Sequence, residues 1–163
     1  MKKINNIFLA ILTGGILLTG CSNKVINSEK ENESSRINKT LTYEVETGDK
    51  IEISLNTSEG YNIDSKVPFS ISKNDETISQ GTFIQEKYYE EYLNAVKTDN
   101  TAEILDTGVK SGNEYLFWEY DDTEWNYVMK IGDSNTALLI ASDVSESDAR
   151  DVFNLLEIRK LTE

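Results

Sequence analysis

The sequence predicts an α+β domain in which two helices pack against a mainly antiparallel sheet. Most of residues 41–141 consists of short runs with an apolar side chain at every second position, a pattern typical of half-buried strands. Two segments instead place apolar residues three and four positions apart, as amphipathic helices do. The order of strands, helix, strands and helix indicates a layered α+β arrangement.

The first strands are predicted from three alternating runs. Thr47-Gly48-Asp49 forms a turn between the first run and the second, and Asn74-Asp75 forms a turn after the third. A further strand is predicted near residues 78–84. The apolar positions of the three runs are Leu41, Tyr43 and Val45, then Ile51, Ile53 and Leu55, then Val67, Phe69 and Ile71.

Two helices are predicted, over residues 86–98 and 145–157. Ser145 stands where the second helix needs an N-cap, and Asp148 follows three residues later, which resembles a capping box. Each helix has one apolar stripe, so each is expected to lie on a sheet. The stripes are Tyr89, Tyr92, Leu93 and Val96 in the first helix, and Ala149, Val152, Phe153 and Leu156 in the second.

Between the helices the pattern returns to strands. Strands are predicted over residues 103–109 and 137–141, with turns near Gly112 and Gly132. The order of elements over residues 50–160 resembles the Mog1/PsbP-like α/β sandwich, which also occurs in small secreted bacterial lipoproteins. The resemblance implies an antiparallel sheet covered by helices and a non-enzymatic binding or accessory role. It carries no functional residue over to this chain.

Residues 115–127, YLFWEYDDTEWNY, hold both tryptophans and six of the 15 aromatic residues. A hairpin with a four-residue turn at 121–124 is predicted here. Because side chains alternate along a strand, one face would be wholly apolar, and it is expected to be core beneath a helix. The alternative is a groove whose rings stack on a ligand. The apolar face would pair Tyr120 with Trp125, Trp118 with Tyr127 and Leu116 with Met129. The mixed face would pair Glu119 with Asn126, Phe117 with Val128 and Tyr115 with Lys130.

The turn of this hairpin is acidic. Asp121, Asp122 and Glu124 supply oxygen ligands that could bind a hard cation such as calcium. The turn lacks the ligand spacing and the glycine of an EF-hand loop, and solvated turns commonly carry Asp and Thr. A calcium site and an ordinary solvated turn both stay open.

The chain opens with features of a secretory signal. Lys2 and Lys3 precede an apolar run over residues 7–18, which is too short for a membrane-spanning helix of roughly 20 residues. Leu18-Thr19-Gly20-Cys21 follows and resembles the lipobox of bacterial lipoprotein precursors. The resemblance implies that the Cys21 thiol receives a diacylglyceryl group and that the precursor is cut before Cys21. The alternatives are an ordinary cleaved signal peptide or an uncleaved N-terminal anchor.

Three parts are therefore predicted: a lipoprotein signal peptide over residues 1–20, lipidated Cys21 with a flexible polar tether to residue 40, and one α+β domain over 41–163. Residues 22–40 have no aromatic residue and too little apolar surface to offset the entropy of ordering. Loss of residues 1–20 would remove two lysines and no acid, which leaves 14 basic against 29 acidic residues, or −15. Such a chain is expected not to bind nucleic acid.

The composition argues against enzymatic chemistry. The chain has no histidine, and Cys21 is its only cysteine, so the commonest general base is absent and no disulfide can form within the chain. No nucleophile elbow, P-loop or dinucleotide-binding glycine motif occurs. A Ser-x-x-Lys motif runs from Ser70 to Lys73, but Ile71 between them reads as core of a strand, so we interpret the motif as chance.

The leading prediction is a membrane-anchored lipoprotein on the outer side of the bacterial cell membrane. Lipid on Cys21 would hold it there, since two acyl chains anchor stably. Its domain would bind a protein or an envelope component, without cofactor, metal or catalysis. Two alternatives remain: a lipoprotein that binds a small molecule or a cation such as calcium, and a hydrolase that uses paired carboxylates.

Overall fold

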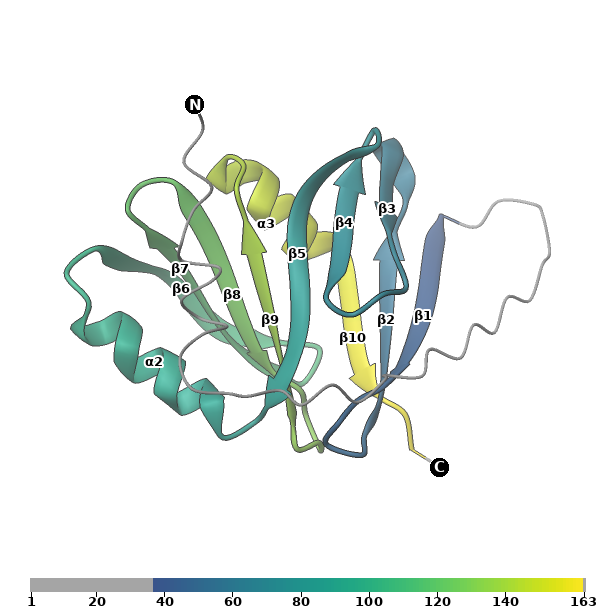
Figure 1. Ribbon diagram of the computed structural model, residues 1–163, viewed down its shortest axis with the longest axis horizontal. Helices are drawn as coiled ribbons and strands as arrows, with labels where there is room; N and C mark the ends of the chain where they lie inside the picture. The colour runs from purple at the N-terminus through teal and green to yellow at the C-terminus, as the bar shows by residue number, and fades with distance from the viewer. Residues whose placement is uncertain (1–36, 163) are drawn as a thin grey trace.

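The computed structural model describes residues 37–162 and shows two antiparallel sheets and two α-helices (Figure 1). The smaller sheet has the strand order β1-β2-β10, with β1 (Asn38–Glu44), β2 (Lys50–Asn56) and β10 (Leu156–Lys160). The larger sheet has the order β3-β4-β5-β9-β8-β7-β6, with β3 (Tyr61–Ile63), β4 (Phe69–Lys73), β5 (Glu76–Gln85), β6 (Ala102–Lys110), β7 (Asn113–Tyr120), β8 (Glu124–Lys130) and β9 (Thr136–Ser142). A short 3-10 helix, η1 (Ser58–Gly60), precedes β3. The predicted α+β class with a mainly antiparallel arrangement is confirmed.

The two helices cover opposite faces of the larger sheet. Helix α2 (Tyr88–Thr98) forms a small core with Leu116, Trp118 and Val128. Helix α3 (Glu146–Leu155) belongs to the main core, which fills the space between the two sheets and includes Phe117 and Tyr127. Residues 116, 117 and 118 alternate between the two cores as a strand requires. Strand β9 is buried along its whole length, which explains why it reads as a continuous apolar run rather than an alternating one.

The cap of α3 is confirmed, whereas its predicted end at residue 157 is wrong. The Ser145 hydroxyl accepts a hydrogen bond from the Asp148 backbone N–H at 3.1 Å, as an N-cap does. The helix ends at Leu155, because Leu156 is extended and opens β10. Strand β10 pairs with β2, so Leu156 and Ile158 are buried against the smaller sheet. Helical spacing alone could not reveal this long-range pairing.

The tether was predicted to reach residue 40, but β1 begins at Asn38. Asn38, Lys39 and Thr40 pair with Asn56, Leu55 and Ser54 of β2. Backbone pairing with β2 holds these three polar residues in the sheet, and the Thr40 hydroxyl also donates to the Ser54 hydroxyl at 3.1 Å. Residues 1–36 lie outside the described part of the chain, and with them the signal peptide, Cys21 and most of the tether.

The predicted register of the β7–β8 hairpin is wrong by one residue. Tyr120 pairs with Glu124, so three residues rather than four lie between the strands. Asp121 and Asp122 both have positive φ, and the Thr123 backbone N–H donates to the Tyr120 carbonyl at 3.2 Å, as in a type I′ turn. A one-residue shift moves every side chain of β8 to the opposite face. Phe117 therefore pairs with Tyr127, and Trp118 pairs with Asn126.

The aromatic residues of this hairpin are consequently divided between two cores. Trp118 is 3% exposed, and its ring lies 6.0 Å from that of Tyr92 on α2. On the other face, the Phe117 and Tyr127 rings stack at 4.1 Å, and Tyr127 stacks on Phe153 of α3 at 4.3 Å. The prediction of core is confirmed for Leu116, Trp118, Tyr127 and Met129, whereas Tyr120 and Trp125 are only half-buried. Phe117, predicted on the mixed face, is buried as well, and a single aromatic face does not exist.

A buried carboxylate joins the two sheets at one end of the molecule. Asp49, in the turn between β1 and β2, accepts hydrogen bonds from the Asn135 backbone N–H and the Thr136 hydroxyl, both at 2.8 Å. Lys160, at the end of β10, forms an ion pair with Asp49 at 2.8 Å. Burial alone would raise the pKa of Asp49, but the hydrogen bonds and the charge of Lys160 outweigh it and lower the pKa. Asp49 thus ties the ends of β1, β9 and β10 together.

Candidate functional site: the acidic end of the larger sheet

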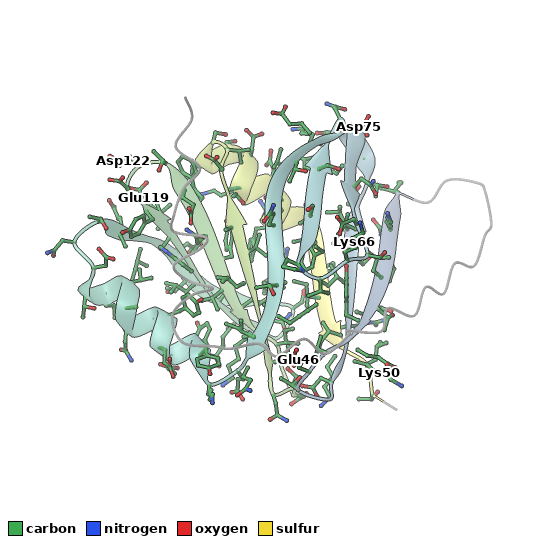
Figure 2. All side chains as sticks on the ribbon, viewed as in Figure 1. Glu46, Lys50, Lys66, Asp75, Glu119 and Asp122 are labelled. Carbon is green, nitrogen blue, oxygen red and sulfur yellow. The ribbon has the colours of Figure 1, made fainter. Side chains whose placement is uncertain are left out.

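A group of carboxylates lies where β7 ends and β6 and β8 begin, near the start of α3. Glu119 of β7 is directly opposite Glu103 of β6. Partial burial raises the pKa of Glu119, and so do the charge and hydrogen bond of Asp122 and the charges of Glu103 and Glu146. Figure 2 shows Glu119 and Asp122 side by side at this end, far from Glu46 and Asp75. We call these four residues, Glu103, Glu119, Asp122 and Glu146, the acidic end.

One basic side chain offsets part of this charge. Arg150 of α3 forms ion pairs with Glu146 at 2.7 Å and with Asp106 at 4.0 Å. Its guanidinium lies 4.4 Å from the centre of the Phe117 ring, which holds it against the sheet. Glu119 and Asp122 form no ion pair within 4.0 Å in the described chain. These two carboxylates could therefore meet a cation from outside.

A second group of oxygens lies on the opposite face of the same hairpin. Glu124 is 4% exposed and Asn126 is 1% exposed, and both are at the β7–β8 end of β8. Burial raises the pKa of Glu124, the Asn126 hydrogen bond lowers it, and the charge of nearby Asp143 raises it, with a net upward shift. Glu124 Oε1 and Asn126 Oδ1 have no hydrogen-bond partner among the described residues.

The structure does not bring the predicted cation ligands of the turn together. Asp121 and Asp122 are exposed at the tip, whereas Glu124 is buried in β8. Between residues 37 and 162, no group of three Asp, Glu, Cys or His side chains has a geometry that could hold a metal ion. The three carboxylates of the turn therefore do not form a common ligand set in the described chain.

Sequence reasoning missed most of the acidic end. Glu103 and Glu146 come from segments 16 and 27 residues away from Glu119 in sequence, and only the β6–β7 register and the position of α3 place them nearby. The sequence did contain part of the information, because Glu103 and Glu119 are the like-charged ends of two adjacent predicted strands. Recognising it required the pairing of those strands, which the pattern of alternation does not specify.

The remaining predictions about location rest on residues outside the described part of the chain. Cys21, the predicted lipidation site, precedes residue 37. Neither helix in residues 37–162 has the length and apolar character needed to cross a membrane.

The Ser-x-x-Lys residues lie on strand β4, where Ile71 is fully buried, as the sequence predicts.

Comparisons with known proteins found no match to this chain among protein-family models, curated proteins or solved structures. The resemblances to lipoprotein precursors and to the Mog1/PsbP-like sandwich therefore stay predictions. What can be assigned to the chain rests on its own geometry and charge.

Proposed function

We propose that this chain is a non-catalytic binding module, carried by a lipid-anchored protein outside the cytoplasm, whose acidic end binds a positively charged partner. The observation that carries the proposal is Glu119. Partial burial and then the charges of Asp122, Glu103 and Glu146 raise its pKa, so that its ionised form is disfavoured in the free protein. A cation bound there would relieve this repulsion, and the relief would contribute to the binding free energy.

The rest of the molecule is consistent with recognition by charge. The chain carries a net charge of −13, which favours the approach of basic partners over a long range. Two exposed carboxylates at the tip, Asp121 and Asp122, widen the acidic surface. The predicted lipid on Cys21 and the tether would present this surface to a protein or an envelope component beside the membrane.

Titration of the full chain with a fluorescent oligolysine peptide at several salt concentrations tests the proposal. The double variant Glu119→Gln, Asp122→Asn should bind the peptide roughly twofold to thirtyfold more weakly, since each exposed ion pair contributes about 0.2–1 kcal/mol. Affinity should fall as salt rises.

The matched control is the double variant Glu46→Gln, Asp75→Asn, which makes the same change in net charge far from the acidic end (Figure 2). It should bind like the unmodified chain. Equal weakening in both double variants would mean that only net charge attracts the peptide, and the proposed surface would be wrong.

Hydrolysis by paired carboxylates is a second candidate function. Glu119 and Asp122 lie side by side (Figure 2), and partial burial followed by the charge of Asp122 raises the pKa of Glu119, as the acid of a carboxylate pair requires. A screen of glycoside and ester substrates tests it. Turnover that Glu119→Gln abolishes would favour the enzyme, whereas unchanged background rates would favour the binding module.

A further inference from the structure

Two buried oxygen atoms on strand β8 lack hydrogen-bond partners. Glu124 Oε1 and Asn126 Oδ1 are both acceptors, and both side chains are more than nine-tenths buried. A buried polar atom without a partner costs free energy, and most such atoms in native proteins are paired. Two of them, two residues apart on one strand, need a common explanation.

The two oxygens lie on the same face of the larger sheet, beside the part that α2 covers. Residues 124 and 126 project to the face that also carries Val128, which packs under α2. The α2 core on this face includes Leu116, Trp118 and Val128. Asn126 is the cross-strand partner of Trp118 at the edge of this core, whereas Glu124 is the partner of Tyr120 next to the turn. Figure 1 shows α2 across the lower part of the sheet, away from the β7–β8 turn. The two acceptors therefore lie between the edge of the α2 core and the β7–β8 turn.

Aromatic and acidic neighbours surround these acceptors. Tyr120 and Trp118 pair with Glu124 and Asn126 across the hairpin, so their rings share the same face. The charge of Asp143, just after β9, acts on Glu124. Neither Glu124 nor Asp143 is within ion-pair distance of a Lys or Arg in residues 37–162. Carboxylates, an amide oxygen and aromatic rings together suit a cation that donates hydrogen bonds.

The geometry points to Glu124 and Asn126 as a site for a protonated alkylamine, with Asp143 as a second negative charge and Tyr120 beside the alkyl chain. An ammonium group has three donors and no acceptor, which matches two free acceptor oxygens and a carboxylate. The inference deepens the proposed function and rests on it, because it names a lysine-like group as the feature that this end of the sheet recognises.

The amine could belong to a lysine side chain of a partner or to a free diamine, and one experiment separates them. The full chain is titrated with 1,5-diaminopentane, with an oligolysine peptide and with the neutral analogue 1,5-pentanediol. Both tryptophans of the chain, Trp118 and Trp125, are on the hairpin that carries the site, so intrinsic fluorescence reports binding. Binding by the diamine identifies a free amine as sufficient, whereas binding by the peptide alone identifies a polypeptide lysine.

Glu124→Gln should lower the affinity for whichever amine binds by about tenfold or more, because it removes the charged partner of a buried hydrogen bond. Asp143→Asn should also lower the affinity for this amine, and its exposed position puts folding at no risk. Glu46→Gln removes an equal charge in the distant β1–β2 turn (Figure 2) and is the matched control, which should change diamine affinity less than about twofold.

Unchanged amine affinity in both Glu124→Gln and Asp143→Asn would overturn the inference, and so would equal binding of 1,5-pentanediol. If oligolysine binding falls in Glu119→Gln, Asp122→Asn but not in Glu124→Gln or Asp143→Asn, the inference fails while the proposed function stands. If neither amine binds the unmodified chain, both fail.

Discussion

Glu119 lies in an environment that differs from that of an ordinary surface carboxylate. Since the folded protein raises its pKa above the ordinary value of 4.5, folding is favoured when Glu119 is protonated. This stability is present below pH 4.5 and is lost as the pH rises through the higher pKa of the folded state. At neutral pH the ionised side chain therefore destabilises the fold.

Glu119→Gln should accordingly melt at a higher temperature than the unmodified chain at pH 7 and at the same temperature below pH 4. Thermal unfolding followed by circular dichroism across this range measures the difference. Glu46→Gln, which replaces an exposed carboxylate in the β1–β2 turn, is the control and should change the melting temperature at pH 7 less than Glu119→Gln does. A lower melting temperature for Glu119→Gln at pH 7 would mean that Glu119 makes a stabilising contact instead.

Trp118 tests the core beneath α2. Its side chain is 3% exposed and packs against Tyr92 and the other apolar residues of that core. Trp118→Ala should lower the free energy of unfolding by roughly 3–5 kcal/mol, because it leaves a large cavity. Urea titration measures this loss. Val109→Ala, at a position 68% exposed, should change it by less than about 0.5 kcal/mol. A loss below about 1 kcal/mol for Trp118→Ala would favour the ligand-binding groove that the sequence left open.

At the scale of elements, the junction between α3 and β10 depends on a lysine from another hairpin. The last turn of α3 has no basic residue, and its carbonyl groups need donors. Lys110, at the end of β6, donates to the carbonyl oxygens of Phe153, of Asn154 at 3.2 Å and of Leu156 at 2.7 Å. Its charge also stabilises the negative end of the helix dipole. The β6–β7 turn thereby fixes the point where helix changes to strand.

Lys110→Met keeps the aliphatic stem and removes the donors, so it should cost on the order of 1.5–3 kcal/mol. Hydrogen exchange of the Leu156 and Ile158 amides should become faster. Ser111→Ala, which removes an exposed hydrogen bond to Glu157, is the control and should change stability by less than about 0.5 kcal/mol. If exchange in β10 is unchanged in Lys110→Met, the lysine does not hold this junction.

Periodicity predicted the elements better than it predicted their pairing. The stripes of α2 and α3 and the runs of β1, β2 and β4 follow from alternation and spacing, because one face of each element is buried. The register of the β7–β8 hairpin could not be predicted, since both faces of that hairpin are buried and apolar residues occur on each. Only the backbone conformation of Asp121 and Asp122 distinguishes a three-residue loop from a four-residue turn. The acidic end depends on the β6–β7 register and on the position of α3, which alternation does not specify either, so it too was missed.

At the scale of the whole molecule, Asp49 connects the two sheets. Its pKa is lowered, so its contribution to stability is present above the ordinary value of 3.8 and is lost as the pH falls through the lower pKa of the folded state. Asp49→Asn should cost on the order of 1.5–3 kcal/mol at pH 7, because charged hydrogen bonds from Lys160, Thr136 and Asn135 are lost.

The difference between Asp49→Asn and the unmodified chain should shrink below pH 3.8, which urea titrations at several pH values can measure. The double variant Asp49→Asn, Lys160→Met should lose less stability than the sum of the single variants, since the two side chains form one ion pair. Additive losses of stability, or a stability difference independent of pH, would show that the charge of Asp49 does not stabilise the fold.

The most direct measurement of the central claim is an amide chemical-shift map of the full chain in uncharged detergent micelles, recorded during titration with oligolysine. If the acidic end is the binding surface, shifts should concentrate in residues 119–126 and 143–146 and saturate together. Shifts spread evenly over all acidic regions, including Glu46 and Asp75, would contradict the account, because they would show attraction to net charge without a site.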